Sequence, residues 1–206
     1  RTIAARRADF VTNGCDLEPA AIACANGYRD GVRYVVGSAT ALPYADETFG
    51  LVLVFDVLEH LEQPDLALSE ICRVLRPGGL LHMLVPCEGQ PRSLHWLMWK
   101  ARIGADLKKR HSGHVQRFTR AALLALVATS GLKVGNVTYS MHPVGQMRDI
   151  ATYLADEPFF RRWHLDNPGY RALIRLLWIA SYVESQILSR VPYGAVALHV
   201  TAAKPD

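Results

Sequence analysis

Two apolar runs with a helical stretch between them constrain the fold of this chain more than any other feature of the sequence. Residues 49–55 read FGLVLVF and residues 80–86 read LLHMLVP, and neither run alternates regularly between apolar and polar residues. Strands that are apolar on both faces are typical of a parallel sheet covered on both sides. Between the runs, Leu68, Ile71 and Leu75 recur at helical spacing, which predicts a helix with one buried stripe. This alternation predicts an α/β fold with a parallel sheet.

The same alternation extends upstream. Residues 11–16 predict a strand that ends at Asp16, and residues 18–26 predict a helix with Pro19 in its first turn. Residues 32–39, VRYVVGSA, are rich in β-branched and aromatic side chains and predict the next strand. An acid at the end of a strand is typical of the edge of a nucleotide pocket.

The regularity breaks after residue 87. Residues 88–118 form a connection that is too long for an ordinary loop, which predicts a functional lid. The stretch 92–120 holds eight Arg or Lys residues, a single acid, and the rings of Trp96 and Trp99. These features favour recognition of an anionic or membrane-surface substrate, with a solvated basic loop as the alternative. The modest net charge of +4 and the lack of an RNA-binding module argue against nucleic acid.

The C-terminal part predicts two more strands with a helical insertion between them. Thr119 is expected to cap a helix that ends before Gly131, and residues 132–141 and 194–204 predict the closing strands. The insertion, residues 143–192, contains a long amphipathic-to-apolar helical stretch. We expect it to form a cap over the active site or a dimer face, with contact to a membrane as the less favoured alternative.

Composition sets the remaining limits. A chain of 206 residues, half of them hydrophobic, predicts one domain over residues 1–206. The four cysteines lie apart in apolar contexts without a CxxC pair, which indicates reduced thiols in a cytoplasmic protein. The longest apolar run contains Arg175 and is too short to span a bilayer.

Five blocks of the sequence resemble the class I S-adenosylmethionine-dependent methyltransferases, in particular their type 11 small-molecule group. The blocks occur in the order and spacing of the family; they are GCDLEP at 14–19, VVGSATALPYADETFG at 35–50, VLVFDVLEHL at 52–61, ALSEICRVLRPGGLLHM at 67–83 and HVQRFT at 114–119. The resemblance implies a Rossmann-like, doubly wound, mostly parallel sheet and S-adenosyl-L-methionine as the cofactor.

The resemblance also implies the residues that hold the adenosine part of the cofactor. Asp16 falls where the family accepts hydrogen bonds from both ribose hydroxyls, a task that suits an acceptor-only carboxylate. Leu17 would lie against adenine. Ser38 and Ala39 occupy the positions that meet the adenine edge, where the family commonly has an acid followed by alanine. The serine is a departure that predicts a weaker adenine clamp.

Further residues are implied around the reacting part of the cofactor. Phe55 and Asp56 fall where the family's chain passes the methionine moiety, and a carboxylate favours the positive sulfonium or ammonium group. The LEH sequence that includes His60 is interpreted mainly as structural. His111 and His114 are the candidates for a catalytic base or orienting group, because neutral imidazole titrates near neutral pH. No metal site is predicted.

One part of the family's pattern is missing. Family members carry a GxGxG loop after a central first strand, whereas residues 1–10 here read as the helix that follows such a loop. The first strand and the glycine-rich loop are therefore expected to be absent from this chain, which favours truncation upstream. Loss of a central strand is expected to expose sheet edges.

The resemblance implies methyl transfer to an oxygen or carbon of a small-molecule or lipid-like acceptor. The residues FDVL at 55–58 stand where amine methylators often have NPPY, and a proline–cysteine nucleophile of the cytosine-C5 type is not expected. A non-catalytic methyltransferase-like scaffold or partner subunit is the main alternative, favoured by the missing loop. A nicotinamide-dependent dehydrogenase is a weaker one.

Overall fold

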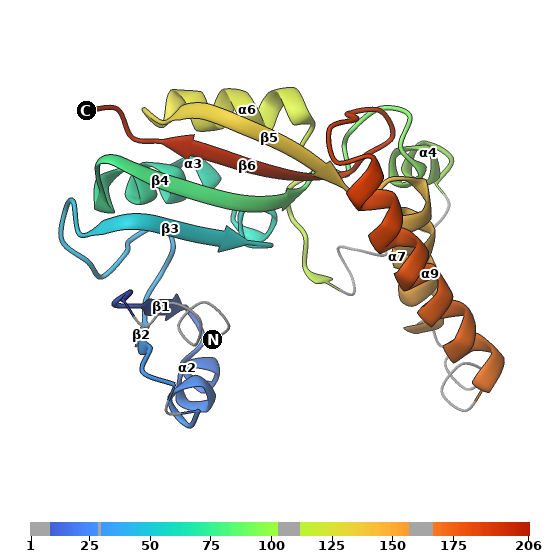
Figure 1. Cartoon of the computed structure of the whole chain (residues 1–206), viewed down its shortest axis with the longest axis horizontal. Coiled ribbons are helices and arrows are strands. Elements are labelled where there is room, and N and C mark those ends of the chain that lie inside the picture. The colour runs from blue at the N-terminus through green and yellow to red at the C-terminus, as the bar shows by residue number, and fades with distance from the viewer. Residues whose placement is uncertain (1–8, 29, 103–111, 157–166) are drawn as a thin grey trace.

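The computed structural model describes residues 9–28, 30–102, 112–156 and 167–206 of the chain (Figure 1). The strands are β1 (Asn13–Asp16), β2 (Arg33–Val36), β3 (Phe49–Phe55), β4 (Leu75–Pro86), β5 (Lys133–Ser140) and β6 (Ala197–Ala203). The helices are α2 (Pro19–Asn26), α3 (Pro64–Val74), α4 (Leu94–Lys100), α6 (Arg120–Thr129), α7 (Pro143–Asp156), α9 (Pro168–Ile187) and the 3-10 turn η1 (Leu58–His60).

The strands form two separate sheets. β1 and β2 pair in parallel, and a second sheet has the order β3-β4-β6-β5. β3 and β4 are parallel, while β6 runs antiparallel to both of its neighbours, so that three of the four strands share one direction. Within the described residues no strand lies between β1 and β3, and each is left at the edge of its sheet. This break lies where the sequence predicts that a central strand is absent.

The main core lies between the four-stranded sheet and helices α3 and α6, which cover one of its faces (Figure 1). Alternate residues of β4, namely Leu81, Met83 and Val85, are fully buried against this layer. Each such side chain stabilises the fold by roughly 1.5–3 kcal/mol through removal of apolar surface from water. Leu68 of α3 and Leu123 of α6 pack into the same cluster, as the helical spacing of α3 predicts.

The opposite face of the four-stranded sheet is open at β3 in the described part of the chain. Leu51, Leu53 and Phe55 are 37–48% exposed, whereas Val52 and Val54 point toward the core. The sequence predicts helices on both faces of the sheet, but the described helices cover one face at β3 and leave the other open. β3 is apolar on both faces, but the described helices cover only one of them.

Local signals explain most of the helix boundaries. Glu18 caps α2 through its side chain, which accepts a hydrogen bond from the N–H of Ala20, and a proline occupies the first turn as predicted. The Thr119 hydroxyl accepts from the N–H of Ala122 and caps α6, which confirms the prediction for that residue. β4 begins at Leu75, five residues earlier than its apolar run, because Leu75 already pairs with Phe49.

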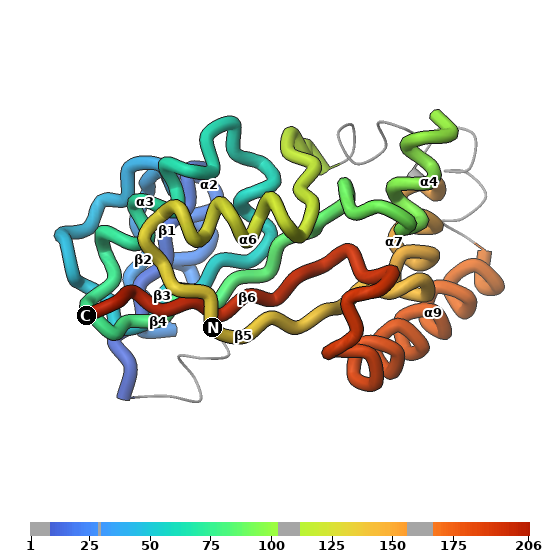
Figure 2. Tube along the Cα trace, turned by 90° about the horizontal axis from the view of Figure 1, so that it is seen from above, coloured from blue at the N-terminus to red at the C-terminus, as the bar shows by residue number. Residues whose placement is uncertain are grey.

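The helical insertion contains α7 and α9, which pack against each other at the end of the molecule away from β1, β2 and α2 (Figures 1 and 2). Asn167 caps α9, and Pro168 occupies its first position. None of the described helices combines the length and the apolarity that crossing a membrane requires. All four cysteines are unpaired, as expected.

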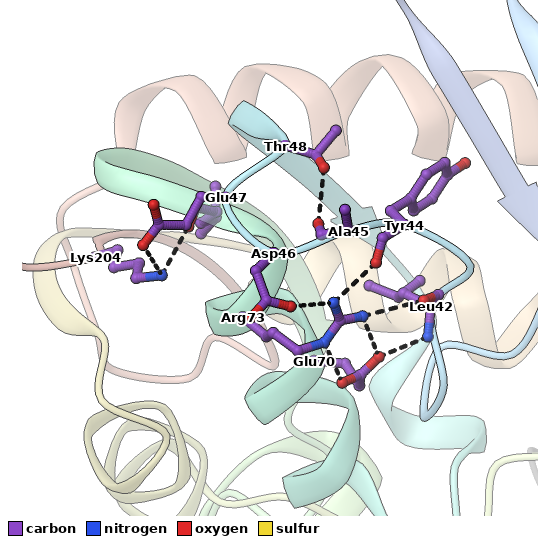
Figure 3. A network of polar contacts seen from close by, with 10 residues as sticks. Leu42, Tyr44, Ala45, Asp46, Glu47, Thr48, Glu70, Arg73 and Lys204 are labelled. Carbon is purple, nitrogen blue, oxygen red and sulfur yellow. Dashed lines mark hydrogen bonds and ion pairs between the residues drawn. The ribbon is translucent and has the colours of Figure 1, made fainter.

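Arg73 of α3 fastens the segment between β2 and β3 to the main core (Figure 3). Its guanidinium binds both carboxylate oxygens of Glu70 at 2.7 and 2.8 Å and donates to Oδ1 of Asp46 at 2.7 Å. It also donates to the backbone oxygens of Leu42 and Tyr44. Because the Arg73 side chain donates to Glu70, the pKa of that carboxyl is lowered. The network connects the segment between β2 and β3 to α3.

Replacing Arg73 with methionine is expected to lower the free energy of unfolding by about 1–2 kcal/mol, since several charge-assisted hydrogen bonds are lost from a partly exposed site. Arg76→Met is the matched control, because Arg76 donates a single hydrogen bond to the backbone oxygen of Glu47. Urea unfolding curves of the two variants provide the measurement. Equal midpoints for both variants would show that the network does not stabilise the fold.

Candidate active site

A cleft of about 670 Å³ opens at the carboxyl ends of β3 and β4, where α7 and α9 face the sheet. Ligands of open α/β sheets bind at this edge. The end of β3 contributes Asp56, and the end of β4 contributes Leu84 and Pro86. On the other side, α9 contributes Trp178 and Tyr182, whose rings stack at 6.2 Å.

Asp56 occupies a strained position at the end of β3. Its φ is 51°, which is unusual for a residue with a side chain, and its N–H donates to the backbone oxygen of Leu84 at 3.1 Å. The residue lines the cleft, and its place near the methionine part of a cofactor stays a prediction. Phe55, in contrast, is 48% exposed on the open face of the sheet, edge to face with His82.

The residues expected at adenosine lie at the carboxyl ends of β1 and β2 and in the segments that follow these strands. Asp16 ends β1, is exposed, and accepts the N–H of Glu18 at its Oδ1 atom, at 2.9 Å. Leu17 is 72% exposed. The Ser38 hydroxyl contacts the hydroxyl of Thr40 at 2.8 Å and accepts the Thr40 N–H. Ala39 is half-buried against the core.

The carboxyl ends of β1, β2 and β3 thus present two carboxylates and one hydroxyl. An exposed carboxylate such as that of Asp16 accepts from two hydroxyl groups, and Asp56 attracts a positive group. This donor and acceptor set fits a nucleoside with a cationic tail.

His114 lies in the cleft beside a buried carboxylate. Its Nδ1 is 3.0 Å from Oε1 of Glu88, and the two side chains are 9% and 3% exposed. The N–H groups of Val115 and Gln116 donate to the backbone oxygen of Glu59, which fastens this segment to η1. His111 lies outside the described residues, so its predicted role stays a prediction.

Glu59 is the second carboxylate near His114. Its side chain is fully buried, and neither carboxylate oxygen has a hydrogen-bond partner among the described residues. Burial raises its pKa to about 7; the backbone N–H of Glu59 itself and then the nearby His114 oppose this rise, and Asp56 and Glu88 reinforce it. Nε2 of His60 lies 3.8 Å from Oε1 of Glu59, and the rings of His60 and His114 meet edge to face at 4.8 Å.

Sequence reasoning assigned no role to Glu59 or Glu88. Glu59 belongs to the block at 52–61, and Glu88 follows the strand that ends at Pro86. They lie 55 and 26 residues from His114 in the sequence, and local spacing carries no signal for contacts at that separation. Only the fold brings the cluster together.

Pro86 and Cys87 are adjacent in the sequence, the residue pair that cytosine-C5 enzymes use as a nucleophile, although no such nucleophile is expected here. The Cys87 side chain is fully buried. Burial raises the pKa of its thiol to about 12, so the thiol stays protonated at neutral pH. A protonated, buried thiol is unsuited to nucleophilic attack.

Comparison with known proteins agrees with this geometry. A family profile described as a methyltransferase domain matches residues 2–83. An uncharacterized methyltransferase of Mycobacterium sp. (strain JLS) is 27% identical over 78% of the chain, and the chain spans 63% of that relative's length. A malonyl-[acyl-carrier protein] O-methyltransferase of Methylococcus capsulatus is 52% identical over 25% of the chain and 19% of its own length.

Among solved structures, a putative methyltransferase from Bacillus halodurans aligns with a TM-score of 0.60 and 20% identity, covering 100% of the chain and 88% of its own length. The fold is that of a Rossmann-like α/β protein. Over residues 2–83 the chain matches the methyltransferase-domain family, and its fold is similar to that of solved methyltransferases, as the sequence blocks predict. The cofactor that goes with this family is S-adenosyl-L-methionine.

Proposed function

We propose that the protein transfers a methyl group from S-adenosylmethionine to an acidic hydroxyl, or to an equally acidic carbon, of a small-molecule or lipid-like acceptor in the cleft. The observation that carries the proposal is the buried pair of His114 and Glu88, with 3.0 Å between Nδ1 and Oε1. With Nδ1–H donated to a carboxylate, the imidazole keeps a basic lone pair on Nε2. An acidic acceptor needs such a group at the point where it loses its proton.

The bound cofactor supplies an electrophilic methyl group on a sulfonium and leaves as S-adenosylhomocysteine. Asp16 would accept the ribose hydroxyls, and Leu17 would cover adenine. Ser38 and Ala39 would meet the adenine edge, and the carboxylate of Asp56 would attract the positive end of the cofactor. A displacement of this kind depends mainly on holding the two reactants close and aligned.

The lipid-like class of acceptor is supported by α9. Trp178 and Tyr182 line the cleft and are 57% and 58% exposed, so the aromatic wall continues onto the outer surface of the helix. Leu173, Leu176 and Ile187 are also exposed, on the side of α9 that faces away from Trp178. A surface of this kind suits an apolar acceptor, a membrane surface or a second copy of the chain.

The basic lid of residues 88–118 supports an anionic group on the acceptor. In its described part, Lys100 and Arg117 both lie over the ring of Trp99, at 5.5 and 5.7 Å from the centroid. Arg148 of α7 lines the cleft itself. A cation at this position favours a carboxylate or phenolate over a neutral acceptor.

S-adenosylhomocysteine at about 100 times its Kd is expected to stabilise this chain by roughly 2.7 kcal/mol, a rise in Tm of about 5–11 °C. Asp16→Asn is expected to abolish most of that rise, because the amide presents one acceptor oxygen in place of two. Asp65→Asn, an exposed acid in the first turn of α3, is the control and should keep the full shift. Thermal unfolding with and without the ligand measures both.

A cooperative transition that the ligand leaves unmoved would contradict cofactor binding by this chain and favour the scaffold alternative. A full shift in the Asp16→Asn variant would instead remove Asp16 from the site.

A further inference from the structure

The geometry points to a divalent transition-metal site formed by Glu59, His60 and His114 at the cleft. One candidate ligand atom from each residue lies within 4.8 Å of the others. Two imidazoles and one carboxylate make a donor set that binds Zn²⁺ and similar ions and leaves further positions open for a substrate. The sequence predicted no metal site, since Glu59 and His114 meet only in the folded chain.

The first argument is the state of Glu59. Its carboxylate is fully buried, yet neither oxygen has a hydrogen-bond partner among the described residues. A buried carboxylate without a partner costs several kcal/mol, and native structures normally pair such groups or bind a metal with them. A cation beside Glu59 would remove this cost.

The second argument is the orientation of His114. Its Nδ1 is engaged by the buried carboxylate of Glu88, which leaves Nε2 as the nitrogen available to a ligand. A carboxylate that holds the far nitrogen of a histidine is the usual outer partner of a metal ligand, because it fixes the tautomer and raises the basicity of the ring.

The third argument is charge and access. Asp56 and Glu88 lie near enough to Glu59 to affect its pKa, and Glu88 also contacts His114. Carboxyl groups at these positions attract a cation. Asp56, His60 and His114 line the cleft, so an ion and a substrate have a route in.

The three candidate ligand atoms need to move only slightly closer together to bind one ion. Metal–ligand bonds of about 2.0–2.2 Å place the ligand atoms about 3–3.5 Å apart, somewhat closer than they lie here. Oε1 of Glu59 and Nε2 of His60 are separated by 3.8 Å, and His60 is 37% exposed. A side chain with that freedom is able to close the remaining gap.

The role of the ion rests on the proposed function. An acceptor hydroxyl beside a divalent ion has a lowered pKa, so it gives its proton to solvent more readily and presents an oxygen lone pair for methyl transfer. His114 then acts as a metal ligand that orients the ion. The metal site itself stands on the three ligands and does not require that the protein methylates anything.

Binding of Zn²⁺ and Mn²⁺ to tag-free, chelator-treated protein, measured by calorimetry without cofactor or acceptor, tests the site. We expect one ion per chain, and a loss of at least 100-fold in affinity for Glu59→Gln and for His114→Ala. Glu88→Gln should lose about 10–100-fold, as outer partners of metal ligands do. His82→Gln should bind normally, because His82 contacts Thr201 on the open face of the sheet.

Far-UV circular dichroism, together with the shift induced by S-adenosylhomocysteine, shows whether each variant is folded. Stoichiometry well below one ion per chain, or equal losses in His82→Gln and His114→Ala, would overturn the metal site. Metal binding without any response to S-adenosylhomocysteine would instead keep the site and contradict the proposed function.

Discussion

Replacing His114 with alanine is expected to lower the rate of methyl transfer by about 10²–10⁴-fold while leaving the affinity for S-adenosylhomocysteine unchanged. The imidazole lies in the acceptor cleft, on a segment that the backbone of Glu59 holds in place, and its hydrogen bond goes to Glu88, which is not expected to hold the cofactor. Whether the ring takes the proton or holds a metal ion, its removal leaves the acceptor protonated.

Transfer of a labelled methyl group to a panel of phenols, enols and carboxylic acids would identify an acceptor for the unmodified protein, and the same acceptor would then be used for the variants. Glu88→Gln is expected to show a smaller loss, since the imidazole remains but its tautomer is no longer fixed. Asp65→Asn serves as the control. A His114→Ala variant that keeps the rate of the unmodified protein would exclude His114 from acceptor activation.

A metal requirement separates the two roles of His114. If the ring is a ligand, a chelator should suppress the unmodified enzyme to the level of His114→Ala, and added Zn²⁺ or Mn²⁺ should restore the unmodified enzyme alone. If the ring is itself the base, the chelator leaves the rate unchanged and the rate rises with the fraction of neutral imidazole.

Local sequence signals were sufficient for the regular elements of this fold. β3 matches its apolar run at 49–55, α3 starts at Pro64, and α6 starts directly after its Thr119 cap. These features depend on side-chain periodicity and on hydrogen bonds between residues a few positions apart, which a single sequence displays directly. Asp16 was singled out as an acid at the end of a predicted strand and Asp56 through the family resemblance; both follow strands in the structure, and their roles stay predictions.

Features that depend on distant contacts were not predictable. Leu53 is exposed because no described helix covers that face of β3. In the sequence, an apolar run looks the same whether or not a helix covers it. The early start of β4 follows from the pairing of Leu75 with Phe49, in a strand 26 residues away. Likewise, Glu59 looked structural until the backbone of the segment at Val115 brought His114 beside it.

Glu59 is expected to make the metal-free protein less stable as the pH rises from about 5 to about 8. Its pKa in the folded state is raised from 4.5 to about 7, so the folded protein holds a proton that the unfolded chain has released. A raised carboxyl pKa therefore contributes a loss of stability that begins above the unfolded pKa and is complete above the folded one. A shift of this size corresponds to about 3 kcal/mol at most.

Comparing the unmodified protein with Glu59→Gln isolates this effect, because other groups such as His199 contribute equally to both. The difference in unfolding free energy between them, measured with denaturant in the presence of a chelator, should fall by about 2–3 kcal/mol between pH 5 and pH 8. Glu70→Gln is the matched control: the pKa of Glu70 is lowered, so its titration lies below this window and its difference curve should be flat. Parallel profiles for all three proteins would mean that Glu59 titrates normally in the folded state.

Because an ion at this site binds the charged carboxylate, added Zn²⁺ at pH 8 should stabilise the unmodified protein and have little effect on Glu59→Gln.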